Sequence, residues 1–199
     1  MSANAKTSGE GIRAVARKLL EREGIERLSM QAVADAVGVR APSLYKRFSS
    51  RGDLLNAITA DALRELQCSL EKAVRPGFPY RSLRRMAAAY RAFAKNNPHA
   101  YSLFFDESPP SPNGDPLLEG RLAPAAALFQ ILSEAIGDEK ALLAARTLVA
   151  FLHGFVSMEL GNAFHFGGDI NTAFRFGLAA ILDALLASDN KTRRHSRDR

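Results

Sequence analysis

The sequence predicts an all-α protein, because helical periodicity runs through nearly all of its 199 residues. No run alternates apolar and polar residues for long enough to indicate a sheet. Glycines and prolines divide the periodic stretches into segments of ordinary helix length. With 47% hydrophobic residues, the chain can bury a substantial core. We therefore expect helices packed on helices.

The first predicted helix ends at Gly24. Thr7 and Ser8 precede it as possible N-caps, since a side-chain oxygen there can accept a backbone N–H of the first turn. Its apolar positions recur at helical spacing and are Ile12, Val15, Ala16, Leu19 and Leu20. One face of this helix is therefore expected to be buried.

Residues 29–48 indicate two short helices joined by a glycine turn. The first has Ser29 as its cap and an apolar face made by Met30, Val33, Ala34 and Val37. It stops at Gly38, which is free to take the positive φ of a sharp helix end. Pro42 suits an early position of the second helix, whose apolar face holds Leu44, Tyr45 and Phe48.

The second of these helices also carries side chains that can bond phosphates or base edges. They lie between the apolar positions and are Arg40, Ser43, Lys46 and Arg47. Tyr45 has two interpretations, a core aromatic or a ring that packs while its hydroxyl reaches a phosphate. Phe48 is expected to be core. The pattern predicts a helix that enters a groove of duplex DNA.

The remaining chain predicts helices separated by clear breaks. They span about 53–74, 80–95, 98–105, 117–135, 139–163 and 170–187. Arg75-Pro76-Gly77 ends the first of them and forms the expected hinge region. Three prolines in residues 108–114 require a loop, and Gly167-Gly168 indicate the turn before the last helix.

Positive charge is concentrated at the two ends of the chain. The formal net charge of +6 divides into +4 over residues 1–60, −1 over 61–187 and +3 over 188–199. The N-terminal part is thus suited to a polyanion, although basic termini can also serve solubility alone. The tail from residue 188 lacks apolar residues and is expected to be disordered.

Residues 1–60 resemble the DNA-binding domain of the TetR family of bacterial transcriptional repressors. The shared features are the small Ala34, the Gly38-Val39 step, Tyr45 with Phe48, and a basic residue, Arg51, ahead of Leu54 and Leu55. Arg40 and Arg51 differ from the residues common in the family, Ser and Lys. The resemblance implies DNA contacts from Ser29, Arg40, Ala41, Pro42, Ser43, Tyr45, Lys46, Arg47 and Arg51.

The C-terminal half resembles the WHG-type ligand-binding domain of some TetR proteins. The similar stretches are residues 97–101, His153-Gly154 and Glu159-Leu160-Gly161, whereas the tryptophan of that motif is absent. The resemblance implies a three-helix DNA-binding domain over 1–52, a helical ligand-binding and dimerisation domain over 53–187, and a tail over 188–199.

A ligand pocket is indicated by aromatic and polarizable residues of the middle region. The candidates are Met86, Tyr90, Phe93, Tyr101, Phe104, Phe129, His153 and Met158. Ordinary core packing explains such residues equally well. Tyr90 and His153 stand out because a polar tip on an apolar helix needs a partner, which for His153 could also be backbone or a dimer seam. The effector is expected to be apolar or aromatic, because these helices offer few buried cations.

The last helix has an apolar stripe too wide for one core. Its members are Ile170, Ala173, Phe174, Leu178, Ile181, Leu182, Leu185 and Leu186. Pairing two copies through the last two helices would form a four-helix bundle and set two recognition helices roughly 34–36 Å apart, as a palindromic operator requires. The alternative is a buried central helix in a monomer.

Catalysis, metal binding and cofactors are not expected. The four histidines lack ligand spacing, no glycine-rich phosphate loop is present, and Cys68 has no histidine nearby in sequence. No uninterrupted apolar run reaches the length of a membrane span, and nothing indicates secretion, so a cytoplasmic protein is expected.

These features predict a sequence-specific regulator, most simply a repressor released by a small effector. A DNA-organising protein without effector and a helical ligand- or partner-binding module without a DNA role remain as alternatives.

Overall fold

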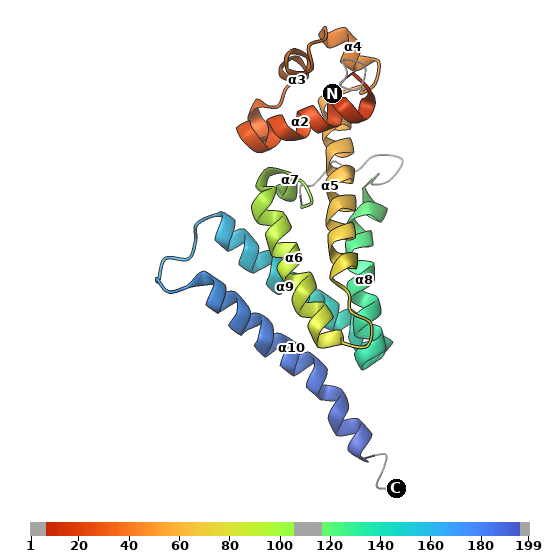
Figure 1. The fold of residues 1–199 in the computed structure, drawn as a ribbon, viewed down its shortest axis with the longest axis vertical. Helices are drawn as coiled ribbons and strands as arrows, with labels where there is room; N and C mark the ends of the chain where they lie inside the picture. Colours follow the sequence, from red (N-terminus) through yellow and green to blue (C-terminus); the bar gives the residue numbers. More distant parts are fainter. Residues whose placement is uncertain (1–6, 106–116, 196–199) are drawn as a thin grey trace. The chain divides into compact units, whose positions relative to one another are not determined.

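The structure, a computed structural model, describes residues 7–105 and 117–195, with side chains described to residue 187 (Figure 1). Its elements are α2 (Gly9–Glu23), the 3-10 turn η1 (Ile25–Arg27), α3 (Met30–Val37), α4 (Ala41–Tyr45), α5 (Arg51–Ala73), α6 (Pro79–Asn96), α7 (Pro98–Ser102), α8 (Leu118–Ile136), α9 (Asp138–Leu160) and α10 (Ile170–His195). The described residues contain no strand, and the predicted all-α class is confirmed.

The chain divides into two compact units. One comprises residues 1–65 and 97–121, and the other residues 66–96 and 122–199. The boundary predicted after residue 52 therefore falls inside the first unit, and that domain division stays a prediction. Helices α5 and α8 each begin in the first unit and end in the second.

In the first unit, α2 packs on α3 and α3 on α4 around a small apolar core. Leu20, Val33 and Leu44 are fully buried there. Burying a side chain of this size contributes about 1.5–3 kcal/mol, so these residues hold the short helices together. Ser8 caps α2 as predicted, because its Oγ accepts the Gly11 N–H at 3.0 Å.

The turn after α3 has the predicted geometry. Gly38 lies in the left-handed region, with φ 84° and ψ 35°. Its N–H donates to the carbonyls of Ala34 and Asp35. Helix α4 ends at Tyr45, before the predicted end at Phe48, although the Phe48 N–H still donates to the Leu44 carbonyl at 2.9 Å. Phe48 therefore remains in the core.

Helix α7 is held in the first unit by a carboxylate of α2. Glu21 accepts the backbone N–H groups of His99 and Ala100 at 3.1 and 3.0 Å, so it satisfies the exposed donors at the start of α7. Arg17 donates to Glu21 at 3.2 Å and to the Asn97 side chain at 2.9 Å. No local sequence pattern predicts this cap, because its partners are nearly 80 residues apart.

In the second unit, α6, α9 and α10 pack together. From α10, Phe174, Leu178 and Leu182 are buried, at a spacing of one helical turn. The ring of Phe151 on α9 lies so near Gly177 that an added Cβ would come within 2.9 Å of it. A larger residue at position 177 would therefore require the Phe151 ring to shift.

Two predictions about loops and ends have different outcomes. Gly167 and Gly168 have positive φ and form the predicted turn before α10. The tail from residue 188 was expected to be disordered, but α10 continues to His195. The sequence holds neither glycine nor proline from residue 178 to 195, so each added residue extends an existing helix at little cost. The predicted loop at 108–114 and residues 196–199 lie outside the described residues.

By length and composition alone, α9 and residues 170–187 of α10 could each cross a membrane. Neither helix is an uninterrupted apolar run, because Arg146 and His153 break the run in α9 and Asn171 and Arg175 break it in α10. Core helices pass the same test, and both α9 and α10 bury one face within the second unit.

Candidate nucleic-acid interface and a basic groove

The residues of α4 and its flanks separate into a buried and an exposed set. Leu44 is fully buried and Phe48 is 8% exposed, whereas Tyr45 is 52% exposed. The interpretation of Phe48 as core is confirmed, and the one of Tyr45 as core is wrong. The exposed set also contains Arg40, Pro42, Ser43, Lys46 and Arg47, while Ala41 is half-buried. We call Arg40, Ser43, Tyr45, Lys46 and Arg47 the α4 face.

The cations of the α4 face are unpaired within the described residues. No described side chain forms an ion pair with Arg40, Lys46 or Arg47. Their charge is therefore available to an external anion, and phosphate neutralisation by such cations releases counterions and drives binding to nucleic acid.

Two residues predicted to contact phosphates have structural roles. Ser29 caps α3, since its Oγ accepts the Ala32 N–H at 3.1 Å. The guanidinium of Arg51 donates from Nε to the Leu28 carbonyl at 2.5 Å and from Nη2 to the Ile25 carbonyl. Arg51 thus attaches the start of α5 to the segment between α2 and α3. A contact of either residue with DNA stays a prediction.

The predicted ligand residues do not form one site within either unit. In the second unit Met86 and Phe93 are buried, Tyr90 and His153 are half-buried, and Phe129 and Met158 are exposed. Tyr101 and Phe104 belong to the first unit, where their rings meet edge to face with centroids 5.8 Å apart. A role of these residues in binding a ligand stays a prediction.

His153 has a polar neighbour on its own helix. Its Nδ1 lies 3.4 Å from the Ser157 hydroxyl, one turn further along α9. Burial lowers the pKa of His153, so the neutral ring is favoured near neutral pH.

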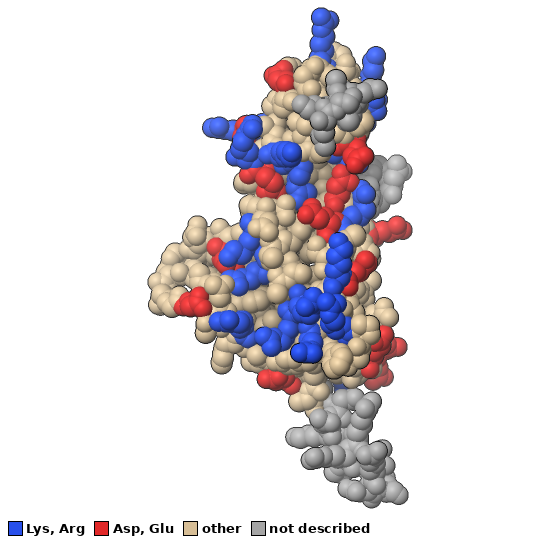
Figure 2. Space-filling model, viewed as in Figure 1, with Lys and Arg blue, Asp and Glu red and all other residues tan. Residues whose placement is uncertain are grey.

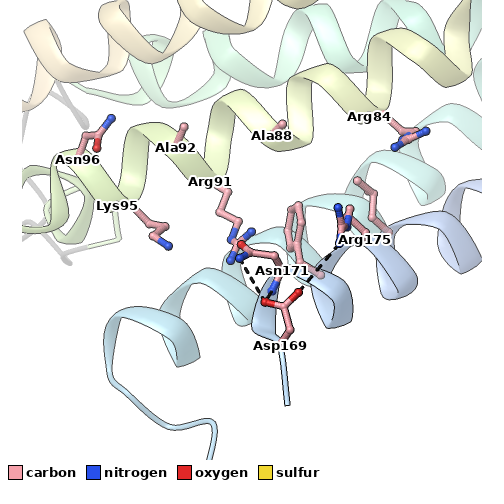
Figure 3. A pocket seen from close by; sticks show the side chains of 11 residues that line it. Arg84, Ala88, Arg91, Ala92, Lys95, Asn96, Asp169, Asn171 and Arg175 are labelled. Carbon is pink, nitrogen blue, oxygen red and sulfur yellow. Dashed lines mark hydrogen bonds and ion pairs between the residues drawn. The ribbon is translucent and has the colours of Figure 1, made fainter. Parts of the chain in front are cut away.

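A basic groove lies between α6 and α10 in the second unit (Figure 3). Its cavity volume is about 740 Å³. Four cations, three amide or carboxylate side chains and four apolar residues line it: Arg84, Arg91, Lys95 and Arg175; Asn96, Asp169 and Asn171; Ala88, Ala92, Phe174 and Leu178. Figure 3 shows Arg91 extending from α6 toward Asn171 at the start of α10.

Two cations of this groove, Arg91 and Lys95, are tethered to one carboxylate. Arg91 makes two hydrogen bonds to Glu159 of α9, at 2.6 and 2.7 Å, and Lys95 lies 2.7 Å from the same carboxylate. The Glu159 side chain is 9% exposed. The Arg91 hydrogen bond lowers the pKa of Glu159, an effect that outweighs the opposing effect of burial. Arg91 also stands 4.7 Å from the centre of the Phe174 ring.

On the α10 side of the groove, Asp169 caps the helix. It accepts the Thr172 N–H at 2.9 Å and the Asn171 N–H at 3.2 Å. It also accepts the Thr172 hydroxyl at 2.6 Å. The hydroxyl hydrogen bond is the main cause of the lowered pKa of Asp169, and the backbone hydrogen bonds add to it. Arg175 donates from Nη2 to the Thr172 hydroxyl at 3.1 Å and has a nitrogen 4.0 Å from the Asp169 carboxylate.

The basic groove is not apparent from the net charge of the long middle segment of the chain. Residues 61–187 sum to −1, but residues 75–96 alone contain six Lys and Arg and no acidic residue. Five of them lie along α6, at Arg81, Arg84, Arg85, Arg91 and Lys95, and Arg81 is three and four positions from Arg84 and Arg85, as Lys95 is four from Arg91. Figure 2 shows Lys and Arg gathered in a patch on the unit that contains α6. A shorter window would have revealed the stripe.

The described residues contain no cluster of three or more His, Cys, Asp or Glu that could hold a metal ion. Cys68 is exposed.

Two family descriptions match the chain. Residues 12–58 match the family described as "Bacterial regulatory proteins, tetR family", which spans the α4 face. Residues 83–181 match the one described as "Tetracyclin repressor-like, C-terminal domain". The finer likeness to WHG-type domains stays a prediction.

Individual proteins are similar over most of their length. The uncharacterized HTH-type transcriptional regulator Rv0681 of Mycobacterium tuberculosis is 32% identical over 160 residues, which cover 78% of this chain and 72% of that protein. A structure of a protein with unknown function from Rhodococcus sp. RHA1 has a TM-score of 0.77 and 22% identity, over 88% of this chain and 93% of the other. A possible TetR family transcriptional regulator from Streptomyces coelicolor A3(2) has a TM-score of 0.69 and 24% identity, over 89% and 98%. These two structures show the shared fold.

Proposed function

Because the chain belongs to the TetR family of DNA-binding transcription regulators, we propose that it is a repressor whose α4 face reads a palindromic operator. The observation that carries this proposal is the set of unpaired cations at Arg40, Lys46 and Arg47, which flank the exposed Ser43 and Tyr45 behind the Gly38 turn. Arg or Lys can bond a guanine edge in the major groove, while Ser and Tyr hydroxyls can bond phosphates.

The outer faces of α9 and α10 support a homodimer. On α9 the exposed positions Leu143, Ala150 and Gly154 share one face, and on α10 so do Phe176 and Ala180. The Phe176 side chain is 77% exposed. An aromatic side chain this exposed on a helix is typical of a surface that a partner covers. Small residues at 150 and 154 would allow a second helix to approach closely. Pairing two copies here as a four-helix bundle would cover both faces.

Release from the operator would follow from a change in the spacing of the two recognition helices. A small molecule that binds the second unit more tightly in one conformation shifts the chain toward that conformation. A coupling free energy of about 1–3 kcal/mol is typical of such regulators. Helix α5 belongs to both units, so its movement is the expected route between them.

The cap on α7 supplies a second element for this coupling. Asn97 follows the last residue of α6 directly and accepts a hydrogen bond from Arg17 of α2. A shift of the α6 end would therefore pull on the Arg17, Glu21 and Asn97 network. This contact is inside the first unit, where the α4 face is also found.

The proposal is tested by selection of binding sites from random duplexes with the full-length chain. We expect one palindromic site, and we expect Arg40→Ala and Lys46→Ala to relax base preference within it. Arg64→Gln serves as the control, because Arg64 is an exposed cation of α5 outside the α4 face. If both α4 variants keep the wild-type preference, the assignment of the α4 face is wrong.

The same experiment separates the alternatives. A DNA-organising protein would select no palindrome and would bind all duplexes with steep salt dependence. A ligand- or partner-binding module would not bind DNA at low ionic strength. Selection of one palindromic site would support the proposed repressor. We propose that this repressor is cytoplasmic, has no enzymatic activity and is regulated by an effector.

A further inference from the structure

We propose that the basic groove between α6 and α10 binds a small anionic amphiphile, a molecule with a carboxylate or phosphate head and an apolar body. This proposal names a ligand class and a site that differ from the apolar effector and the eight residues expected from the sequence. Binding itself does not depend on DNA, whereas the role of this ligand as effector rests on the proposed function.

The charge of the groove selects an anion. Arg84, Arg91, Lys95 and Arg175 line it together with a single carboxylate, that of Asp169. Glu159 neutralises part of the Arg91 and Lys95 charge from beneath, and Asp169 is already engaged with two backbone N–H groups at the start of α10. Arg84 forms no ion pair with any described side chain. The groove therefore retains net positive charge.

Two of the cations are suited to bind the head group directly. Arg84 is exposed on α6, and the Arg175 side chain is 66% exposed on α10. Neither has a short ion pair to break: Arg84 has none with a described side chain, and the Arg175 contact to Asp169 is 4.0 Å long, so Arg175 would give up only its 3.1 Å hydrogen bond to the Thr172 hydroxyl. A guanidinium presents paired N–H donors that match a carboxylate or phosphate.

The apolar part of the groove indicates a body attached to the anion. Ala88 and Ala92 are exposed on α6 and leave space where larger side chains would fill it. Phe174 and Leu178 form the α10 side. Its cavity volume of about 740 Å³ is within the range of small-molecule sites. Inorganic anions alone would leave this surface uncovered.

The proposed dimer would leave the groove open. Groove residues Asn171, Arg175 and Leu178 recur at one helical turn on α10. Phe176 and Ala180 of the proposed dimer face lie on the opposite side of the helix, because they are offset from Asn171 by about half a turn at 100° per residue. A nucleic-acid strand is a poorer occupant than a small amphiphile, since Ala88, Ala92, Phe174 and Leu178 offer its phosphates no donors.

The groove also ends where the chain enters the α7 cap. Lys95 and Asn96 line it, and the next residue, Asn97, is the acceptor of the Arg17 hydrogen bond. A ligand that fixes the end of α6 would thus act on the segment that α2 holds.

The test is calorimetric titration of the full-length chain with octanoate, with octanol and inorganic phosphate as controls. We expect octanoate to bind at least tenfold more tightly than either control. Arg84→Gln and Arg175→Gln are each expected to weaken octanoate binding about tenfold, and their thermal unfolding should match that of the wild type. Arg64→Gln, the control outside the groove, should bind as the wild type does.

Several results would overturn the proposal. They are the absence of octanoate binding, equally tight octanol binding, or unchanged octanoate affinity in both groove variants. Binding of a random duplex that weakens in the groove variants but not in Arg40→Ala would instead identify a polyanion surface. Octanoate that binds the groove without releasing operator DNA would contradict only its role as effector. Loss of the palindromic site in the selection experiment would contradict the proposed function and leave the groove untouched.

Discussion

The α4 face and the basic groove are both rich in arginine and lysine, but they hold these side chains differently. Arg40, Lys46 and Arg47 form no ion pair with any described residue. In the groove, Arg91 and Lys95 share the Glu159 carboxylate, and Arg91 is further fixed against the Phe174 ring. The α4 face thus presents free cations only, whereas the groove combines the tethered Arg91 and Lys95 with Arg84 and Arg175, which are not tethered to Glu159.

This difference indicates what each surface can recognise. Free cations adapt to a long polyanion and gain affinity from counterion release, which depends strongly on salt. Tethered cations have already lost most of their conformational freedom, so a small ligand that meets them has less entropy to lose. Removing a cation of the α4 face should therefore weaken DNA binding. Removing the Glu159 carboxylate should instead lower the free energy of unfolding.

The largest expected effect is on DNA binding by the double variant Arg40→Ala with Lys46→Ala. Loss of two major-groove contacts worth about 1–3 kcal/mol each predicts operator affinity weaker by about thirtyfold or more. Fluorescence anisotropy across a salt series would measure it, and the salt dependence should also become shallower. An unchanged unfolding midpoint is expected, because neither side chain has a partner in the described chain. A large loss of stability would contradict the comparison.

The next effect is on stability, from Glu159→Gln. Removing this charge leaves Arg91 partly buried without its carboxylate, and we expect a loss of about 2 kcal/mol in the free energy of unfolding. Urea denaturation measures this loss. Glu139→Gln is the matched control, an exposed carboxylate on the same helix, with an expected change of a few tenths of a kcal/mol. Equal losses in the two variants would show that the tether adds nothing.

A smaller effect is expected from Gly38→Ala, which places a Cβ at φ 84°. This backbone costs a non-glycine residue about 1–2 kcal/mol, although no atom obstructs the new methyl group. Gly52→Ala is the control, since Gly52 lies inside α5 and alanine there should stabilise by about 0.5–1 kcal/mol. Chemical denaturation measures the change in the free energy of unfolding for each variant. We expect a decrease for Gly38→Ala and an increase for Gly52→Ala, and an increase for both would contradict the role of Gly38 in the turn.

The smallest effect is a pH dependence confined to the groove. Because the folded pKa of Glu159 is lowered, its contribution to stability is complete above its unfolded pKa of about 4.3 and is lost as pH falls through the folded value. The stability difference between wild type and Glu159→Gln should therefore stay constant from neutral pH to about pH 5 and shrink below about pH 4. If the stability difference between the wild type and Glu159→Gln grew on acidification, the stabilising role of the Glu159 carboxylate would be contradicted.

Local features of the fold were predictable from local sequence. Ser8, Ser29 and Gly38 act within one turn of their own positions, so their roles as caps and turn residue follow from residue type and spacing. The burial of Phe48 followed from helical periodicity in the same way. The exposure of Tyr45 did not, because an aromatic ring at a helical apolar position fits either a core or a surface.

The sequence by itself determined the helices, the turn between α3 and α4 and the presence of cations around α4, because each depends on contacts within about four residues. Only the tertiary structure decided that Glu21 caps α7, that Arg51 bonds the Ile25 and Leu28 carbonyls, and that Glu159 tethers Arg91 and Lys95. These partners are 23 to 79 residues apart. Their meeting depends on how helices pack, and helix packing is set by side-chain shape over the whole unit, which spacing along one chain does not encode.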